Sequence, residues 1–453
     1  MERAVVEKIY QEHEKRFIEE WKEFLRFKSI STEPDYEQDC RKCAEWLVSH
    51  LRSIGFEASL LETPSKPTVY GFRKGTAGHP RVLYYGHYDV QPFEPRSEWK
   101  SDPFDPELRN GRLFARGAMD NKGQTFYVLK ALEQLIKHDA LKSDVTVLIE
   151  GEEEGGSEGF MAALAGWKDK LKADVLMVCD TGTLAPGVPA ITMGLRAIGH
   201  LTIKLGGIHK DLHSGVHGGM VKNPATEMCR LIASLHNPDG SIAVKNYYDG
   251  VKEAAAEDRA LANRMPITME QYAGMVGVPP LGGEANYTPL ERRGFRPCID
   301  VNGIHSGYDG PGSKTIIPSF AIAKISARIV AGQDPKRCVE LISQHLKAHA
   351  PKGLNLEVEG AAGPGRAVSL SSKSEIIQKA RQVLLDVSGQ EPLFMWEGSS
   401  IPVVSVLSEI TGAEPLLVGF GVEEDNMHAP NESFSLTQFK DGFMYASMMF
   451  GSF

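Results

Sequence analysis

The chain has 453 residues and a formal net charge of −9, and it is 42% hydrophobic and 24% charged, which is typical of a soluble globular protein with more than one core. The sequence lacks a long Lys/Arg run of the kind that would indicate a nucleic-acid partner. It also lacks a stretch of about 18 apolar residues that would indicate a membrane span. The charged N-terminus lacks the apolar segment of a signal peptide, and cysteines number only six, so we expect a cytoplasmic protein.

Helices and apolar strands alternate over about the first 197 residues. Each expected strand is a short continuous apolar run, such as VTVLI at 145–149. Strands of this kind, separated by helices, favour a mostly parallel sheet. The expected helices are 4–27, 37–54 and 123–138, and the expected strands are 81–86, 144–150 and 173–180. Cys40 and Cys43 form a CxxC pair in the second helix, but no second pair completes a zinc site, so we interpret them as structural.

The pattern changes after residue 197. In FAIAKISARIV (320–330) every second residue is apolar, as on an antiparallel strand with one wet face. Similar strands are expected at 200–207 and 354–360, with helices at 223–237 and 335–350. The stretch GAAGPGR (360–366) is a plausible boundary, and a helix at 373–387 and an apolar run at 415–421 then return to the first pattern. We therefore predict an α/β domain of residues 1–197 and 365–453, interrupted by an α+β domain of residues 198–364.

Acidic residues and histidines follow the expected strands. They are His87 and Asp89 after the first strand, Glu152, Glu153 and Glu154 after the second, Asp180 after the third, His428 after the C-terminal apolar run, and Asp120 before the helix at 123. Each has an ordinary explanation alone, as a helix cap, a turn residue or a solvated loop residue. Because the carboxyl ends of parallel strands meet at one edge of the sheet, the joint pattern favours a shared site.

The chemistry of this set indicates divalent metal ions. Imidazole nitrogens with carboxylate oxygens suit Zn²⁺, and also Mn²⁺ or Co²⁺. Two histidines and at least three carboxylates exceed the needs of one tetrahedral ion, and they fit two ions that share a carboxylate. Asp89 lies two residues after His87, on the same strand face, and could orient it. One glutamate would then bind metal while another stays free as a base.

These residues lie in five motifs that resemble those of the M20 metallopeptidases, a family of di-zinc exopeptidases and deacylases. The motifs are GHYDVQP, RGAMDNKG, EGEEEGGSEG, VCDTGT and DNMHAPNE, and the likeness spans nearly the whole chain. The stretches DLHSGVHGG (211–219) and EGSSIPV (397–403) are similar to the cytosolic nonspecific and carnosinase-like dipeptidases. The resemblance implies an α/β catalytic domain with two metals and an inserted lid and dimerisation domain.

The resemblance also implies the ligands of the two ions, most simply Zn²⁺. His87 and Asp180 would bind one ion. Glu154 and His428 would bind the other, and Asp120 would bridge the two. The reaction implied is hydrolysis of dipeptides with a free C-terminal carboxylate by a hydroxide that both ions hold.

Further residues match catalytic and substrate-binding positions of the family. Glu153 would be the general acid and base, and Asp89 would orient His87. In a homodimer, His213 would reach the partner subunit's site and stabilise the oxyanion. The substrate carboxylate would be held by three residues: Arg328, Thr315 and Ser400.

Two positions depart from the expected pattern, and three other functions stay open. Asn121 stands where many relatives have Asp, and His217 where near relatives often have Tyr. The nearer alternative is an N-acyl amino acid deacylase or carboxypeptidase of the same family. A serine hydrolase is a distant one, because Gly155–Gly159 matches G-x-S-x-G but a run of acids precedes Ser157. A non-catalytic metal-binding protein is the other, although structural zinc sites favour thiolates.

Overall fold

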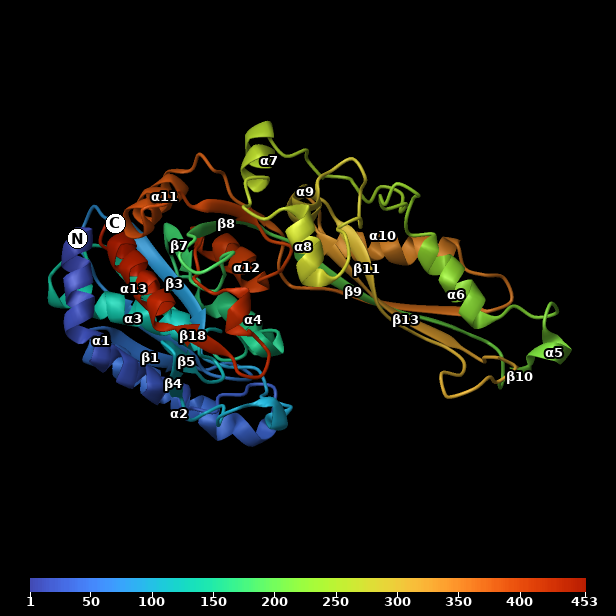
Figure 1. Ribbon diagram of the computed structural model, residues 1–453, viewed down its shortest axis with the longest axis horizontal. Helices are drawn as coiled ribbons and strands as arrows, with labels where there is room; N and C mark the ends of the chain where they lie inside the picture. Colours follow the sequence, from blue (N-terminus) through green and yellow to red (C-terminus); the bar gives the residue numbers. More distant parts are fainter. The chain divides into compact units, whose positions relative to one another are not determined.

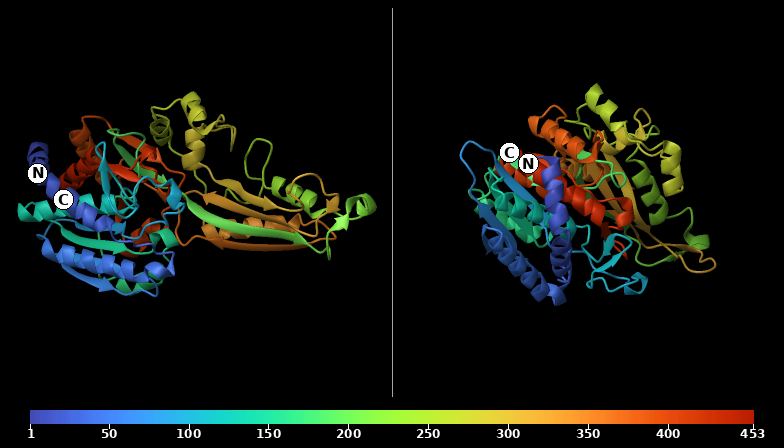
Figure 2. Two further views of the ribbon diagram at one scale, coloured as in Figure 1. Left: turned by 60° about the horizontal axis from the view of Figure 1, so that its bottom comes forward. Right: turned by 60° about the vertical axis from the view of Figure 1, so that its left-hand side comes forward.

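The computed structural model describes residues 1–453 and shows an α/β protein that divides into two compact units. Unit 1 contains Met1–Thr192, Leu370–Phe394 and Leu407–Phe453, and unit 2 contains Met193–Ser369 and Met395–Val406. Figure 1 labels the elements, and Figure 2 shows two further views. None of the helices combines the length and the apolar character that a membrane crossing requires.

The main sheet is mixed, with parallel strands at its centre. Its order is β1-β2-β6-β3-β7-β17-β8-β15, and β16 also pairs with β8. The parallel strands are β3 (Arg81–His87), β6 (Asp144–Glu150), β7 (Val175–Val178) and β17 (Glu414–Leu417). The remaining strands of the sheet are β1 (Glu57–Leu61), β2 (Thr68–Arg73), β8 (Ala190–Leu195), β15 (Val368–Ser369) and β16 (Leu393–Trp396). The predicted parallel core is therefore confirmed.

Helices cover this sheet (Figures 1 and 2). They are α1 (Arg3–Leu25), α2 (Glu37–Ser53), α3 (Lys122–Lys137), α4 (Glu158–Leu164), α11 (Glu375–Ser388), α12 (Pro402–Thr411) and α13 (Leu436–Phe450). The apolar face of α1 packs on α13, where the Trp21 and Phe439 rings stack with centroids 4.7 Å apart. A capping box between Ser435 and Gln438 begins α13. A small sheet of β4 (Glu107–Arg109), β5 (Arg112–Phe114) and β18 (Ser433–Ser435) ties the chain before α13 to the chain before α3.

The ends of β3, β6 and β7 are aligned by their register. Tyr85 of β3 pairs with Leu148 on one side and Val178 on the other, so all three strands finish at one edge of the sheet. Gly86 is needed there, because a Cβ atom would lie 2.5 Å from the Thr125 hydroxyl and 2.9 Å from the Asn121 amide oxygen. The missing side chain lets the start of α3 approach the end of β3.

Unit 2 is built on a four-stranded antiparallel sheet with the order β11-β13-β9-β14. These strands are β9 (Ala197–Gly206), β11 (Cys298–His305), β13 (Ala321–Ile329) and β14 (Asn355–Ala362). Burial largely alternates along β9 and β13, as the sequence pattern predicted. The other elements are α5 (Ser214–His217), α6 (Pro224–Ala233), α7 (Ala256–Ala262), α8 (Met269–Val276), α9 (Pro289–Phe295), α10 (Pro335–Ala348), β10 (Leu212–His213) and β12 (Ile316–Ile317).

The segment Met395–Val406 belongs to unit 2, whereas the sequence prediction placed all of 365–453 in the first domain. Its contacts explain the difference. Trp396 packs on Phe295 with ring centroids 5.0 Å apart. Arg196 donates from its backbone N–H to the Ser399 carbonyl at 3.0 Å and from Nε to the Gly398 carbonyl at 3.1 Å. These partners lie far away in the sequence, so no local pattern indicates them.

Candidate metal centre

Two groups of three ligand residues share Asp120. One group is His87, Asp120 and Asp180, the other is Asp120, Glu154 and His428, and the ligand atoms within each group lie within 4.8 Å of one another. Asp120 Oδ1 lies 3.2 Å from His87 Nε2, and Asp120 Oδ2 lies 2.9 Å from His428 Nε2. Each oxygen of one carboxylate therefore faces a different histidine, which is what a carboxylate shared between two ions requires. The structure brings together all five predicted ligands; their ligation stays a prediction.

Burial and mutual contacts shift the pKa values of the ligand residues. Burial raises the pKa of Asp180 well above its ordinary value, and it also raises the pKa of Glu154. Hydrogen bonds to Asp120 and Glu154 raise the pKa of His428 to about 10. Burial would lower the pKa of His87, but the surrounding carboxylates raise it well above 6.5. The two ligand groups are largely buried, apart from the half-exposed His428, and imidazoles and carboxylates at this spacing fit divalent ions, which compete with protons for the same atoms.

Glu153 and Asp89 lie beside the ligands. Burial raises the pKa of Glu153 to about 7, and the charges of Glu154 and Asp120 add to this rise while His87 opposes it. Asp89 is fully buried, and its Oδ1 lies 3.3 Å from His87 Nδ1. The same carboxylate accepts the backbone N–H groups of Glu153 at 3.2 Å and Glu154 at 3.0 Å. Asp89 therefore fixes the glutamate turn, and its predicted effect on the orientation of His87 stays a prediction.

Two residues near the ligands were not predicted from the sequence. Ser31 Oγ donates to Asp89 Oδ2 at 2.6 Å, and Gln91 Nε2 donates to Glu154 Oε2 at 2.6 Å. Gln91 lies inside the motif GHYDVQP, and an amide two residues after an acidic residue at a strand end was the available signal. Ser31 lies in the loop after α1 and has no such signal.

Two other glutamates of the acidic stretch, Glu150 and Glu152, are structural. The Glu152 carboxylate is buried and accepts the backbone N–H of Phe160 in the first turn of α4, so it stabilises the start of that helix. Glu150 is fully buried against the Tyr85 hydroxyl, and burial raises its pKa well above the ordinary value. Ser157 is also buried, out of reach of a substrate, which argues against the serine-hydrolase alternative.

Asn121, the departure in the second motif, contacts a predicted ligand. Its fully buried amide donates to Asp180 Oδ1 at 2.7 Å and to the Cys179 carbonyl at 2.8 Å. Its oxygen accepts from the Thr125 hydroxyl at 2.7 Å. An aspartate has no N–H to donate here and would face the carboxylate of Asp180 at hydrogen-bond distance. The amide therefore suits this site, because it holds one oxygen of Asp180 and leaves the other free for an ion.

The predicted substrate-binding residues of unit 2 form two pairs. Arg328 Nη1 donates to Ser400 Oγ at 3.0 Å, and burial and then the Arg196 charge lower the pKa of Arg328, so a bound anion would be favoured. Thr315 instead lies beside His213: its carbonyl accepts the Ser214 N–H at 3.0 Å. About 23 Å of β13 separates Ala321 from Arg328, at about 3.3 Å per residue. Within one chain, Thr315 therefore accompanies His213 and not Arg328.

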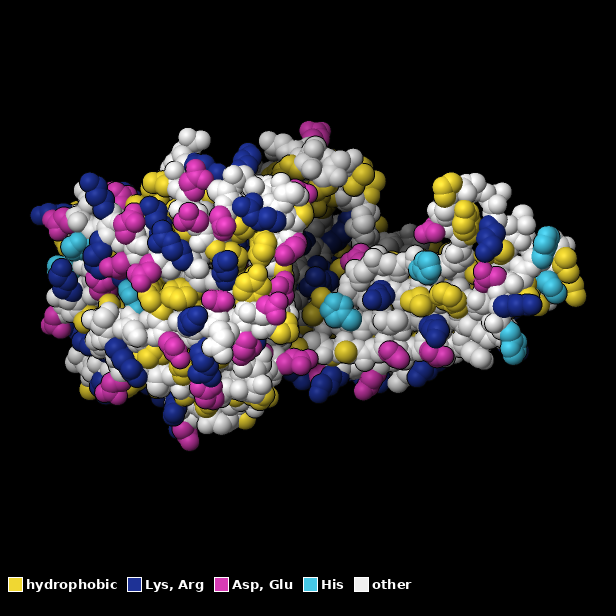
Figure 3. All heavy atoms as spheres, turned by 90° about the horizontal axis from the view of Figure 1, so that it is seen from below, with side chains coloured by type: hydrophobic (Ala, Val, Ile, Leu, Met, Phe, Trp, Pro, Cys, Tyr) yellow, Lys and Arg dark blue, Asp and Glu magenta, His cyan; other side chains and the backbone are white.

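His213 is exposed and has a defined tautomer. Its Nδ1 accepts the Gly215 N–H at 3.1 Å, so the neutral ring carries its proton on Nε2. Val216 and Met220 beside it are 62% and 78% exposed. Figure 3 shows histidine and hydrophobic side chains together at the end of unit 2 that carries α5. His217, at the end of α5, has no contact that assigns it a role.

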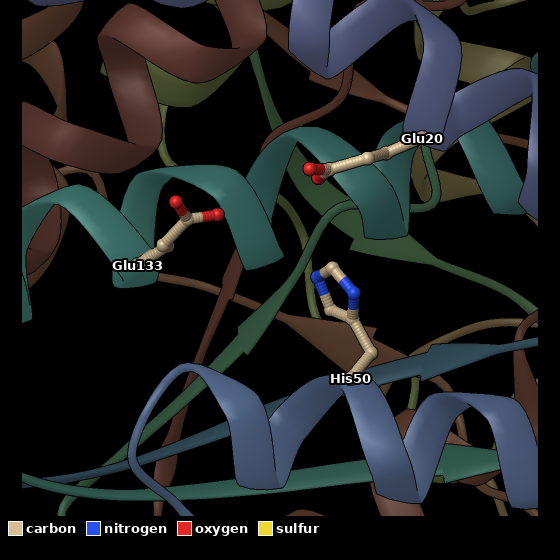
Figure 4. A group of neighbouring side chains, drawn as sticks. All are labelled: Glu20, His50 and Glu133. Atoms are coloured by element: carbon tan, nitrogen blue, oxygen red, sulfur yellow. The ribbon is translucent and has the colours of Figure 1, made fainter.

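A third cluster of ligand-type atoms does not fit a metal. Glu20, His50 and Glu133 face one another from α1, α2 and α3 (Figure 4). Both carboxylates are already paired with the buried Lys130 and with Arg16, at distances of 2.5–2.9 Å. Two cations thus balance two anions, and a divalent ion would have to displace them. We interpret the cluster as a structural ion-pair network.

His50 gives this network a pH dependence. Burial, with the Lys130 charge, lowers the pKa of His50 from 6.5 to about 4. The folded protein therefore binds fewer protons than the unfolded chain, so this contribution to stability is complete above about pH 6.5 and is lost as pH falls toward 4. Between pH 6.5 and 4 this effect lowers the free energy of unfolding by at most about 3 kcal/mol. We expect His50→Phe, which cannot be protonated, to lack this decrease. Urea unfolding of both proteins at pH 7 and 4.5 checks this; equal losses would contradict it.

Comparisons with known proteins show which family and which proteins this chain is similar to. The profile of peptidase family M20/M25/M40 matches residues 83–449. A beta-Ala-His dipeptidase from Rattus norvegicus is 26% identical over 99% of this chain and 95% of its own. A Cys-Gly metallodipeptidase from Schizosaccharomyces pombe is 29% identical over 96% of each chain. The solved structure of an M20 family metallo-carboxypeptidase from Sulfolobus solfataricus has a TM-score of 0.84 at 30% identity, covering 96% of this chain and 98% of that one.

Proposed function

This chain belongs to peptidase family M20/M25/M40, and we propose that it is a metal-dependent dipeptidase that hydrolyses dipeptides with a free C-terminal carboxylate. The observation that carries the proposal is Asp120, with its two carboxylate oxygens facing His87 and His428. The substrate class is supported by the relatives named as beta-Ala-His and Cys-Gly dipeptidases. We also propose a cytoplasmic location, which cell fractionation would test.

Two divalent ions per subunit would be held by the five ligand residues described above. The donor set favours Zn²⁺, with Mn²⁺ and Co²⁺ as alternatives. When bound, such ions polarise the scissile carbonyl and lower the pKa of the attacking water.

The side chains of this chain would move the proton and hold the substrate. Glu153 would take the proton of the attacking water and deliver it to the leaving amine, a task that its raised pKa suits. Arg328 and Ser400 would hold the substrate carboxylate. The Nε2–H of His213 would donate to the oxyanion.

We propose a homodimer in which His213 acts in the partner subunit's site. The support is that His213 is exposed, with its proton on Nε2, next to exposed apolar side chains. Because Thr315 lies beside His213, it would cross to the partner's site together with it.

A substrate panel tests the proposed function. The protein is stripped of metal, reloaded with Zn²⁺, Mn²⁺ or Co²⁺, and assayed with dipeptides, tripeptides and N-acyl amino acids. We expect metal-dependent hydrolysis of dipeptides that have a free α-amine. A carboxypeptidase is the second candidate, since the solved relative at 30% identity is a metallo-carboxypeptidase. Faster cleavage of N-blocked peptides would favour that alternative, and activity without metal would contradict both.

Arg328→Ala is expected to raise KM for a dipeptide by about 10–100-fold, because it removes a charge-assisted hydrogen bond to the substrate carboxylate. Hydrolysis of the matching dipeptide amide, which has no carboxylate, should change little. Lys324→Ala, an exposed cation on the same strand, is the matched control. An equal loss for dipeptide and amide would show that Arg328 does not bind the carboxylate.

A further inference from the structure

A buried glutamate, Glu432, contacts the chain that carries the shared carboxylate. It lies four residues after His428 and is 1% exposed. Its Oε1 accepts the backbone N–H groups of Met119 at 2.9 Å and Asp120 at 3.1 Å. Its Oε2 accepts the backbone N–H of Gly117 at 2.9 Å. Three N–H groups of one short segment thus converge on one carboxylate from the His428 loop.

The fourth donor to Glu432 extends the contact to a third loop. Arg116 Nη1 donates to Glu432 Oε2 at 2.9 Å, and Arg116 Nη2 donates to the Pro92 carbonyl at 2.9 Å. The Arg116 side chain is 1% exposed, and its guanidinium lies 5.2 Å from the centre of the Trp99 ring. Pro92 ends the motif GHYDVQP, which begins beside His87. The ion pair therefore joins the loops of His87, Asp120 and His428.

The negative charge of Glu432 and the positive charge of Arg116 compensate each other in the buried pair. All four partners of the Glu432 carboxylate are donors, so only an ionised carboxylate accepts from each of them. A glutamine would turn its amide N–H groups toward at least one of these donors. Removing one member of a buried ion pair leaves the other without compensation in a dry environment. The contact is thus specific for a glutamate, although Glu432 does not reach the predicted metal ligand atoms.

We propose that the buried Glu432–Arg116 pair is the positioning unit that holds the His87, Asp120 and His428 loops in register, so that the Asp120 carboxylate meets both histidines. Glu432 fixes the peptide from which Asp120 projects, while Arg116 fixes the distance of that peptide from the loop after β3. The pair acts through the ligands and is not itself catalytic. This inference rests on the proposed function only in requiring that the site binds two cations.

Metal binding tests this inference directly. Full-length Glu432→Gln and wild-type protein are titrated with Co²⁺ and Zn²⁺ against a chromophoric chelator, and the visible spectrum of bound Co²⁺ reports ligand geometry. We expect at least one ion of Glu432→Gln to bind about 10–100-fold more weakly, with an altered Co²⁺ spectrum. Both readouts use the metal alone, so they stay informative if no dipeptide is cleaved and the proposed function fails.

Two controls separate positioning from general stability. Glu424→Gln makes the same change at an exposed position of the same loop and should change neither readout. Glu20→Gln weakens the buried Lys130 pair and should lower Tm without affecting Co²⁺ binding. If Glu432→Gln does not fold, Arg116→Lys keeps the charge and loses one of the two donors, and weaker Co²⁺ binding is still expected. A folded variant with lowered Tm but wild-type affinity and spectrum would overturn the inference.

Discussion

Glu153→Gln is expected to lower kcat by about 10²–10⁴-fold while both ions stay bound. Both ions should stay bound because Glu153 lies beside the ligand groups but neither group includes its side chain. Glutamine has nearly the same shape and cannot take a proton. Burial raises the pKa of Glu153 to about 7, close to the value at which a general base is most effective near neutral pH. Steady-state kinetics combined with metal analysis of the same preparation measures both quantities.

The control for this substitution is Glu158→Gln, an exposed glutamate of the same acidic stretch. It should leave both kcat and metal content unchanged. If Glu153→Gln loses an ion together with its activity, then Glu153 is a ligand and the assignment of the base is wrong. If it keeps both ions and full activity, the base must be another group.

One geometric rule explains why the sequence could predict that these side chains lie together. The strands β3, β6 and β7 are parallel, so residues that follow them gather at one edge of the sheet. That rule located His87 and Asp180 without any knowledge of their partners. It also placed Asp120 and His428 at this edge, but it could not predict which oxygen of Asp120 meets His428, 308 residues away in the chain.

The roles of adjacent glutamates could not be predicted from composition. Glu152, Glu153 and Glu154 are identical side chains in a row, and the backbone turn decides where each one goes. In this turn the Glu152 carboxylate points to the start of α4, and the Glu154 carboxylate points to His428. Asp89 accepts the backbone N–H groups of Glu153 and Glu154. The contacts of Glu432 could not be predicted for a similar reason, since a carboxylate that accepts backbone N–H groups leaves no pattern in the sequence.

The strand patterns predicted the antiparallel sheet that follows residue 197, but they could not assign Met395–Val406 to unit 2. This segment belongs to unit 2 because Arg196 binds its carbonyl groups and Phe295 packs on Trp396. One consequence is that Ser400 lies next to Arg328. It also shows that Thr315 and Arg328 cannot hold one carboxylate within a single chain, because β13 separates them.

A mixture of two inactive variants tests whether His213 acts across subunits. His213→Ala alone is expected to lower kcat by about 10²–10³-fold, the usual effect of losing one oxyanion donor, without loss of metal. When it is mixed with Glu153→Gln, half of the dimers formed at random contain one chain of each kind. In such a dimer the His213→Ala chain keeps Glu153 and receives an intact His213 from its partner, so one of the two sites is complete. About a quarter of wild-type activity should return.

Only exchange of subunits can produce this recovery, because neither variant gains a residue in its own chain. The measurement needs co-expression with two affinity tags, so that the mixed dimer is isolated before it is assayed. Its expected activity is then about half that of the wild-type dimer. Mixed dimers as inactive as the two parents would place His213 in the site of its own subunit. A mixture of Glu153→Gln with Glu153→Gln, prepared with the same tags, should show no recovery and gives the baseline.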